Sequence, residues 1–116
     1  MIIGLHAILF TDDAEATRGF LRDTLGLDSV DAGGGWLIFA GPRSELAAHS
    51  TAGHPHHEVY LMCDDIHATV TELAAKGAEF IDGVVEQRWG LSTTLRLPGG
   101  GQIPLYQPSH PSPLIT

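Results

Sequence analysis

The stretch LFTDDAEATRGFL (residues 9–21) returns later in the chain as LMCDDIHATVTEL (residues 61–73). The two stretches align without a gap, and each identical pair is separated by 52 residues. The repeated residues are Leu9, Asp12, Asp13, Ala16, Thr17 and Leu21, which recur as Leu61, Asp64, Asp65, Ala68, Thr69 and Leu73. A constant offset of this kind indicates an internal duplication.

The residues around each copy follow the same order of predicted elements. In the first half, residues 2–10 favour a strand and residues 13–25 a helix that ends at Gly26. Three short strands are then expected at 27–31, 36–40 and 45–50. In the second half, a strand at 58–63 and a helix at 65–76 precede strands at 79–81, 89–97 and 102–107. The sequence therefore predicts an α+β fold of two tandem βαβββ units, residues 1–51 and 57–108, followed by a tail over 109–116.

The charge balance argues against two classes of partner. Fourteen Asp and Glu against six Lys and Arg give a formal charge of −8, so phosphate backbones and anionic membranes would be repelled. No apolar run approaches the roughly 18 residues of a membrane span, and the N-terminal MIIGLHAILF lacks the basic leader of a signal peptide. With Cys63 as the one cysteine, no disulfide within the chain is possible. We therefore expect a cytoplasmic protein that binds neither nucleic acid nor membrane.

The repeat, the strand that bears His6, the helix pattern D-D-x-x-A-T-x-x-F-L-R-D-x-L-G-L and the closing GGGQIPLYQP segment together resemble the vicinal oxygen chelate superfamily of glyoxalases, bleomycin resistance proteins and extradiol dioxygenases. The resemblance spans residues 2–108. It implies that each unit curls into a half-barrel and that two units enclose a shared cavity lined by metal ligands. It also implies a homodimer, in which paired units sometimes come from different subunits.

The offset of 52 residues relates His6 to Glu58, and the resemblance makes both positions metal-ligand sites. Alternation along a strand places Glu58, Tyr60 and Met62 on one face, which we expect to line the cavity. A His nitrogen and a carboxylate oxygen would suit Fe²⁺, Mn²⁺, Ni²⁺ or Zn²⁺. The alternative is structural: His6 makes a hydrogen bond within a half-buried strand, and Glu58 is solvated.

The chain departs from the family pattern in its last strand. Metal-dependent members commonly carry a Glu in a sequence like G-x-I-E-L, where this chain has Pro104. Proline offers no ligand, and its missing N–H predicts an edge or irregular stretch of sheet. His49 is then the candidate third ligand, giving a site of His6, His49 and Glu58 with open positions. Equally, His49 can point to solvent.

Other candidate residues are aromatic or basic. Trp36, Tyr60, Trp89 and Tyr106 lie on predicted strands and are candidates for holding a flat organic ligand, although aromatic residues are more often core. Arg88 and Arg96 share a strand face and could bind a carboxylate, or simply lie at the surface. We interpret the loop histidines His54, His56 and His57 as solvated.

These observations leave three hypotheses for function. The first is a divalent-metal-assisted enzyme, of lyase, isomerase or ring-cleaving dioxygenase type, that acts on a small oxygenated molecule. The second is a metal-free protein that binds a small molecule, as the drug-sequestering members do. The third is a dimer with no ligand, in which side chains fill the cavity. The sequence assigns no catalytic residue, and the fold alone does not choose among the three.

Overall fold

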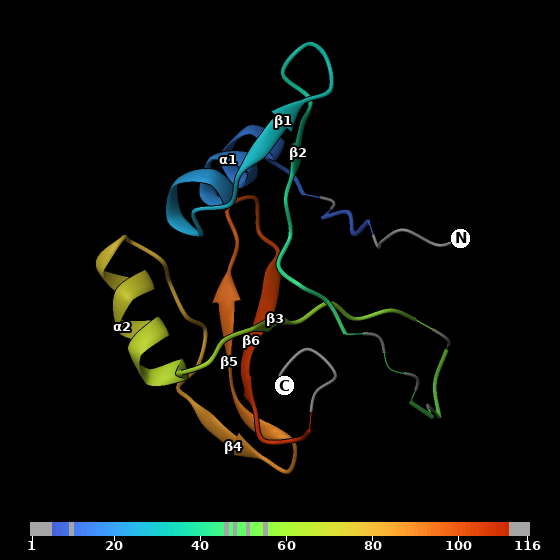
Figure 1. The fold of residues 1–116 in the computed structure, drawn as a ribbon, viewed down its shortest axis with the longest axis vertical. Helices are drawn as coiled ribbons and strands as arrows, with labels where there is room; N and C mark the ends of the chain where they lie inside the picture. Colours follow the sequence, from blue (N-terminus) through green and yellow to red (C-terminus); the bar gives the residue numbers. More distant parts are fainter. Residues whose placement is uncertain are drawn as a thin grey trace.

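The computed structural model describes residues 6–9, 11–45, 47, 49–50, 52–54 and 56–111, and Figure 1 shows their arrangement. Within these residues the helical elements are α1 (Ala14–Gly19), η1 (Phe20–Thr24) and α2 (Ile66–Ala75). The strands are β1 (Ser29–Asp31), β2 (Leu37–Phe39), β3 (Leu61–Met62), β4 (Val85–Gln87), β5 (Gly90–Arg96) and β6 (Gln102–Pro108). The predicted α+β class is confirmed.

Both helices that the repeat predicts begin at an aspartate of the duplicated pair. The Asp13 carboxylate accepts a hydrogen bond of 2.9 Å from the Ala16 N–H, and the Asp65 carboxylate accepts one of 3.1 Å from the Ala68 N–H. Each aspartate therefore satisfies one of the N–H groups that a helix start leaves unpaired. The first helix differs from the second because its last turn widens into the π-helix η1.

The strands form two separate sheets. In the larger sheet the order is β3-β6-β5-β4, with β3 parallel to β6 and the other pairs antiparallel. The smaller sheet is the antiparallel hairpin of β1 and β2, in which Val30 lies opposite Ile38. The helix α2 lies beside the larger sheet, whereas α1 and η1 lie next to the hairpin (Figure 1).

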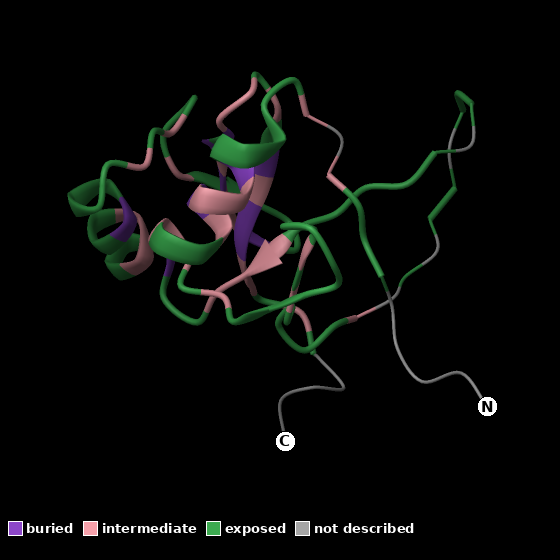
Figure 2. Cartoon of the chain, turned by 90° about the horizontal axis from the view of Figure 1, so that it is seen from above, coloured by how far each residue is buried: buried purple, intermediate pink, exposed green. Residues whose placement is uncertain are grey.

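The hydrophobic core belongs mainly to the second unit. Ile66 of α2 and Leu95 of β5 are fully buried. They are joined in one cluster by the buried side chains of Phe20, Leu73, Leu97, Ile103 and Leu105. Figure 2 shows the buried residues gathered in the sheet and on the helices beside it. None of the described residues from 21 to 65 is buried, so the hairpin of β1 and β2 adds little to this core.

Several predicted strands differ in the structure. The first predicted strand, 2–10, lies partly outside the described residues, and its described part, 6–9, is not in a strand. The same holds for the prediction at 45–50. In place of a strand at 79–81 there is a single bridge between Phe80 and Leu95. The exposed strand β4 was not predicted, because its side chains show no alternation of burial.

Pro104, which was expected in an edge or irregular stretch of sheet, lies within β6 opposite Thr94 of β5. The strand β6 is interior to the sheet, but β3 pairs only with Leu105 and Tyr106. Among the described residues no strand pairs with β6 next to Pro104 on its outer side, so the missing N–H breaks no ladder hydrogen bond between the strands that the structure describes. In the part of the chain that the structure describes, no helix is long and apolar enough to span a membrane.

The turn between β5 and β6 packs against the start of α1 and so joins the two units. The buried Thr17 hydroxyl donates a hydrogen bond of 2.7 Å to the Pro98 carbonyl, and the Thr11 hydroxyl donates one of 3.2 Å to the same oxygen. Gly99 faces this contact so closely that a Cβ atom there would lie against the Thr11 hydroxyl and 2.9 Å from the Asp13 nitrogen. At position 99, therefore, the turn has room for no residue other than glycine.

Replacement of Gly99 by alanine tests this packing, with Gly100→Ala as the matched control. Both glycines have a φ of +92°, so both substitutions carry the same backbone strain, but at Gly100 the nearest atom is 3.9 Å away. We expect Gly99→Ala to lower the free energy of unfolding by about 1–3 kcal/mol more than Gly100→Ala, because only the former also creates a clash. Urea unfolding measures both losses. Equal losses would show that the turn does not pack against α1 in this way.

Candidate functional site

The register of the sheet determines which side chains share the face opposite α2. Leu105 belongs to the core cluster that includes Ile66 and Leu73 of α2, so it points toward this helix. Successive residues of a strand face opposite sides of the sheet, so Tyr106 points away from it. Tyr106 lies opposite Met62 of β3 and Ser92 of β5, and these side chains share its face. The side chains expected to line the cavity from the predicted strand 58–63 therefore lie on the face of the sheet that α2 does not cover.

Three aromatic rings meet on this face, and we name Tyr60, Trp89 and Tyr106 the aromatic cluster. The ring centroids lie 5.9 Å apart for Tyr60 and Trp89, 5.7 Å for Tyr60 and Tyr106, and 5.3 Å for Trp89 and Tyr106. All three pairs are close to perpendicular, at 77–82°. Tyr60 is 39 % exposed and Trp89 37 % exposed, whereas Tyr106 is 9 % exposed. The cluster is thus anchored at Tyr106 and open to solvent at its other two rings.

Two carboxylates bind the hydroxyl groups of the aromatic cluster. Tyr60 donates a hydrogen bond of 2.8 Å to Glu58, and Tyr106 donates one of 3.1 Å to Glu45. The hydrogen bond to Glu58 raises the pKa of Tyr60. Burial, followed by the hydrogen bond to Glu45, raises the pKa of Tyr106 to about 12. Both phenols are therefore protonated at neutral pH, and their protons point toward carboxylates.

Two histidines extend this network. The two ring nitrogens of His56 lie 3.0 Å from the His54 carbonyl oxygen and 2.9 Å from Glu58 Oε2, an arrangement that favours the doubly protonated ring. The bond to the His54 carbonyl, followed by that to Glu58, raises the pKa of His56. The hydrogen bond between His56 and Glu58 lowers the pKa of Glu58. The hydrogen bond from Tyr60 and the charge of His49 lower it further, by smaller amounts. On the other side, His110 Nε2 lies 3.3 Å from the Tyr106 hydroxyl.

Sequence reasoning gave no role to Glu45 at this face or to His110. Glu45 was placed on a predicted strand with His49, and only its contact with Tyr106 reveals its position. His110 lies in the predicted tail, but the Ser109 N–H donates to the Trp89 carbonyl and thereby holds this part of the chain beside the cluster. No pattern in the sequence pointed to either contact.

The predicted metal ligands His6, His49 and Glu58 are all exposed. Among the described residues, no three His, Cys, Asp or Glu side chains lie close enough together to hold a metal ion. Both carboxylate oxygens of Glu58 already accept hydrogen bonds, from His56 and Tyr60. The donors within one chain therefore do not fit a three-ligand site, and the predicted set stays a prediction.

Two of the remaining candidate residues, Trp36 and Arg96, contact side chains outside the aromatic cluster. Trp36 is 66 % exposed beside the hairpin of β1 and β2, where the Arg18 guanidinium lies 5.4 Å from its ring centroid. Arg96 pairs with Glu79 at 3.4 Å, and both side chains are exposed. Cys63 packs against the core cluster, on the side of the sheet opposite Glu58, as the alternation of side chains along a strand requires.

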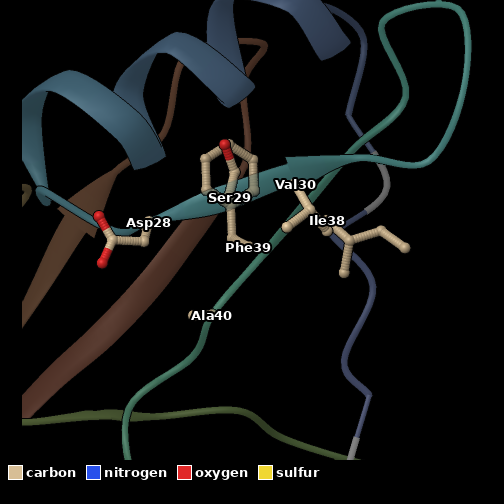
Figure 3. A pocket seen from close by; sticks show the side chains of 6 residues that line it. All are labelled: Asp28, Ser29, Val30, Ile38, Phe39 and Ala40. Carbon is tan, nitrogen blue, oxygen red and sulfur yellow. The ribbon is translucent and has the colours of Figure 1, made fainter.

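A second feature is an apolar hollow of about 250 Å³ on the hairpin of β1 and β2 (Figure 3). It is lined by Asp28, Ser29, Val30, Ile38, Phe39 and Ala40. Val30 and Ile38 lie side by side there, and they are 67 % and 40 % exposed. Exposed aliphatic side chains that adjoin one another in this way are typical of a surface that another protein covers.

The pair of His56 and Glu58 gives a test by pH titration. Because the pKa of His56 is raised and that of Glu58 is lowered, the pair stabilises the fold fully only above the ordinary pKa of a glutamate, about 4.3, and below that of a histidine, about 6.5. We expect Glu58→Gln to lower the pKa of His56, measured by NMR, while the bond to the His54 carbonyl keeps it above the ordinary value. The control Glu72→Gln, on α2, leaves it unchanged. An unaltered pKa of His56 in Glu58→Gln would contradict the pairing.

Known structures share this fold. A lactoylglutathione lyase from Agrobacterium tumefaciens is 20 % identical, with a TM-score of 0.66 over 90 % of this chain and 92 % of its own. A member of the Glyoxalase/bleomycin resistance protein/dioxygenase superfamily from Sphaerobacter thermophilus DSM 20745 is 21 % identical, with a TM-score of 0.65 over 91 % of this chain and 98 % of its own. The antibiotic-binding protein TnmS3 from Streptomyces sp. CB03234 is 25 % identical, with a TM-score of 0.61 over 90 % of this chain and 100 % of its own.

The sequence itself matches one family model, described as the Glyoxalase/Bleomycin resistance protein/Dioxygenase superfamily, over residues 4–103. No curated protein matches the chain. The family match covers well over half of the 116 residues, and the resemblance inferred from the duplicated helix is confirmed. The chain belongs to the Glyoxalase/Bleomycin resistance protein/Dioxygenase superfamily.

Proposed function

We propose that this chain is a cytoplasmic protein that captures a flat organic small molecule at the aromatic cluster, without a metal ion. The observation that carries this proposal is the meeting of Tyr60, Trp89 and Tyr106 on the open face of the larger sheet. The three rings come from separate segments of the chain, so the fold, rather than a local motif, assembles them. Rings held in this way offer a large apolar surface with little conformational entropy left to lose.

The partial exposure of the cluster supports a binding role over a purely structural one. Rings that serve only as core are normally buried, but Tyr60 and Trp89 each leave more than a third of their surface open. A flat ligand that covers them gains apolar burial in proportion to that area. The likeness to TnmS3, an antibiotic-binding protein, agrees with capture of a small molecule.

The chemistry of the donor set favours capture over the metal-assisted reaction that the sequence first suggested. A lyase, isomerase or ring-cleaving dioxygenase of this type would need His6, His49 and Glu58 to converge. Glu58 is instead bound by His56 and Tyr60, and the last-strand position holds Pro104. The likeness to the lactoylglutathione lyase, at 20 % identity, extends to the fold alone.

Tryptophan fluorescence tests the binding site directly, because the chain has only Trp36 and Trp89. In a Trp36→Phe background, Trp89 becomes the sole reporter. We expect saturable quenching by neutral flat compounds such as acridone, and a loss of affinity of about tenfold when Tyr60→Ala removes one ring of the cluster. The reverse background, Trp89→Phe, should show no saturable change at Trp36. If no flat compound quenches Trp89, the proposal is wrong.

A chelator distinguishes capture from a metal-assisted function. We expect the affinity for acridone to be the same before and after treatment with EDTA, because no step of the binding uses a metal. Calorimetric titration of tag-free protein with Fe²⁺, Mn²⁺, Ni²⁺ and Zn²⁺ completes the test. Saturable metal binding that disappears in His6→Ala would favour the metal-assisted enzyme instead.

We also propose that two copies of the chain form a homodimer through the hairpin of β1 and β2. A two-stranded hairpin is marginally stable by itself, and here it exposes Val30, Trp36 and Ile38. The internal repeat supports a second copy as the partner, because the second unit has a helix and a sheet that bury each other, whereas no residue of the hairpin of β1 and β2 is buried by the described part of the chain. A second copy can cover the hairpin without any further protein.

Sedimentation measurements test the dimer. We expect the wild-type chain to sediment as a dimer and Ile38→Asp to weaken self-association by at least about 100-fold, because the interface would bury an unpaired charge. Val85→Asp is the control, since Val85 is similarly exposed but lies on β4, far from the hairpin. A wild-type chain that sediments as a monomer would contradict this interface, as would equal weakening by both variants.

A further inference from the structure

We propose that the ligand of the aromatic cluster is a cation, a flat organic molecule that carries a protonated amine or a quaternary ammonium group. This inference rests on the proposed function, namely that the cluster binds a small molecule. It adds the charge of that molecule, and it follows from three features of the groups around the rings.

The first feature is the direction of the phenol protons. The Tyr60 hydroxyl donates a hydrogen bond of 2.8 Å to Glu58, and the Tyr106 hydroxyl donates one of 3.1 Å to Glu45. A tyrosine hydroxyl has one proton, so each phenol oxygen is left with lone pairs only. The two phenol groups of the cluster therefore accept hydrogen bonds from a ligand and do not donate them, and the donor among its polar groups is the Trp89 indole N–H. The lone pairs of the two phenol oxygens favour positive charge in a ligand, either as the hydrogen bond of a protonated amine or as the electrostatic contact of a quaternary ammonium group.

The second feature is the negative potential of the rings and of their two carboxylates. The face of an aromatic ring carries partial negative charge and attracts cations within about 6 Å of its centroid. Glu45 and Glu58 add formal negative charges that are bonded to two of the three rings. Aromatic faces and carboxylates act in the same direction here, and both repel an anionic ligand.

The third feature is the position of the basic side chains. Arg18 lies over Trp36, and the ion pairs Arg22–Asp23, Lys76–Glu72 and Arg96–Glu79 hold three more of the six basic residues away from the cluster. Arg43 and Arg88 are exposed, and neither forms an ion pair among the described residues. Among the described residues, the basic groups that the structure pairs with the two carboxylates are His56, beside Glu58, and His110, whose Nε2 lies 3.9 Å from Glu45. A ligand cation competes with these imidazoles for the carboxylates.

Three planar tricyclic probes that differ in charge test the proposal at pH 8, with Trp89 as the reporter in the Trp36→Phe background. They are N-methylacridinium, a permanent cation, 9-(hydroxymethyl)anthracene, which is neutral, and anthracene-9-carboxylate, an anion. We expect the cation to bind about tenfold more tightly than the neutral probe, and the anion to bind more weakly than both.

Isosteric variants assign the preference to the two carboxylates. Glu45→Gln and Glu58→Gln keep an acceptor oxygen for each tyrosine but remove the charge. Each is expected to weaken binding of the cation by about three- to tenfold and to leave the neutral probe within about twofold. The control is Glu72→Gln, the same change of charge on α2, on the opposite side of the sheet, and it should alter neither affinity.

The outcomes separate this inference from the proposed function. If the neutral probe binds as tightly as the cation, or the anion binds most tightly, the cluster binds small molecules but does not select cations, and this inference is overturned alone. If none of the three probes quenches Trp89, both the inference and the proposed function are overturned. Because the comparison of probes is made on one protein, it stands even if a Glu→Gln variant fails to fold.

Discussion

The packing of α2 against the hairpin of β5 and β6 determines which face of the larger sheet is available for function. Ile66 and Leu95 are both fully buried where the helix meets the sheet. The Ile66 N–H also donates a hydrogen bond of 2.9 Å to the side chain of Gln107, which ties the start of α2 to β6. With one face closed by apolar contact, side chains on alternate residues must point the other way. Tyr106 lies between Leu105 and Gln107, so the same register that buries the core directs this ring toward the open face.

The helices were the most predictable part of the fold, because their signals are local. Asp13 and Asp65 each precede an apolar stripe with helical spacing, and each caps the helix that follows it. The repeat strengthened both predictions, since a cap and a stripe that occur twice at one offset are rarely coincidental. The π-turn of η1 was not predictable, because no residue type specifies the extra residue that such a turn contains.

The sheet and the candidate site were less predictable, because they depend on pairings between distant residues. Strand β4 has three exposed residues and no alternation, so neither hydrophobic period identifies it. Alternation did place Tyr60 and Glu58 on the face opposite Cys63. It could not place Trp89 or Glu45 beside Tyr106, because those contacts depend on how segments far apart in the sequence pair and pack. Pro104 was expected to indicate an edge strand, and only the shortness of β3 reveals how an interior strand accommodates it.

The two duplicated units carry unequal parts of the structure, and this inequality explains why the site is built as it is. The second unit supplies the sheet, the buried helix face and all three rings of the aromatic cluster. The first unit supplies α1, which holds the turn after β5, and the segment whose Glu45 reaches Tyr106. Most side chains of the first unit lie outside the core. Substitutions at such exposed positions usually change the free energy of unfolding little. In this chain, the stable unit therefore fixes the rings, and the more exposed unit contributes one of the carboxylates that set the charge beside them.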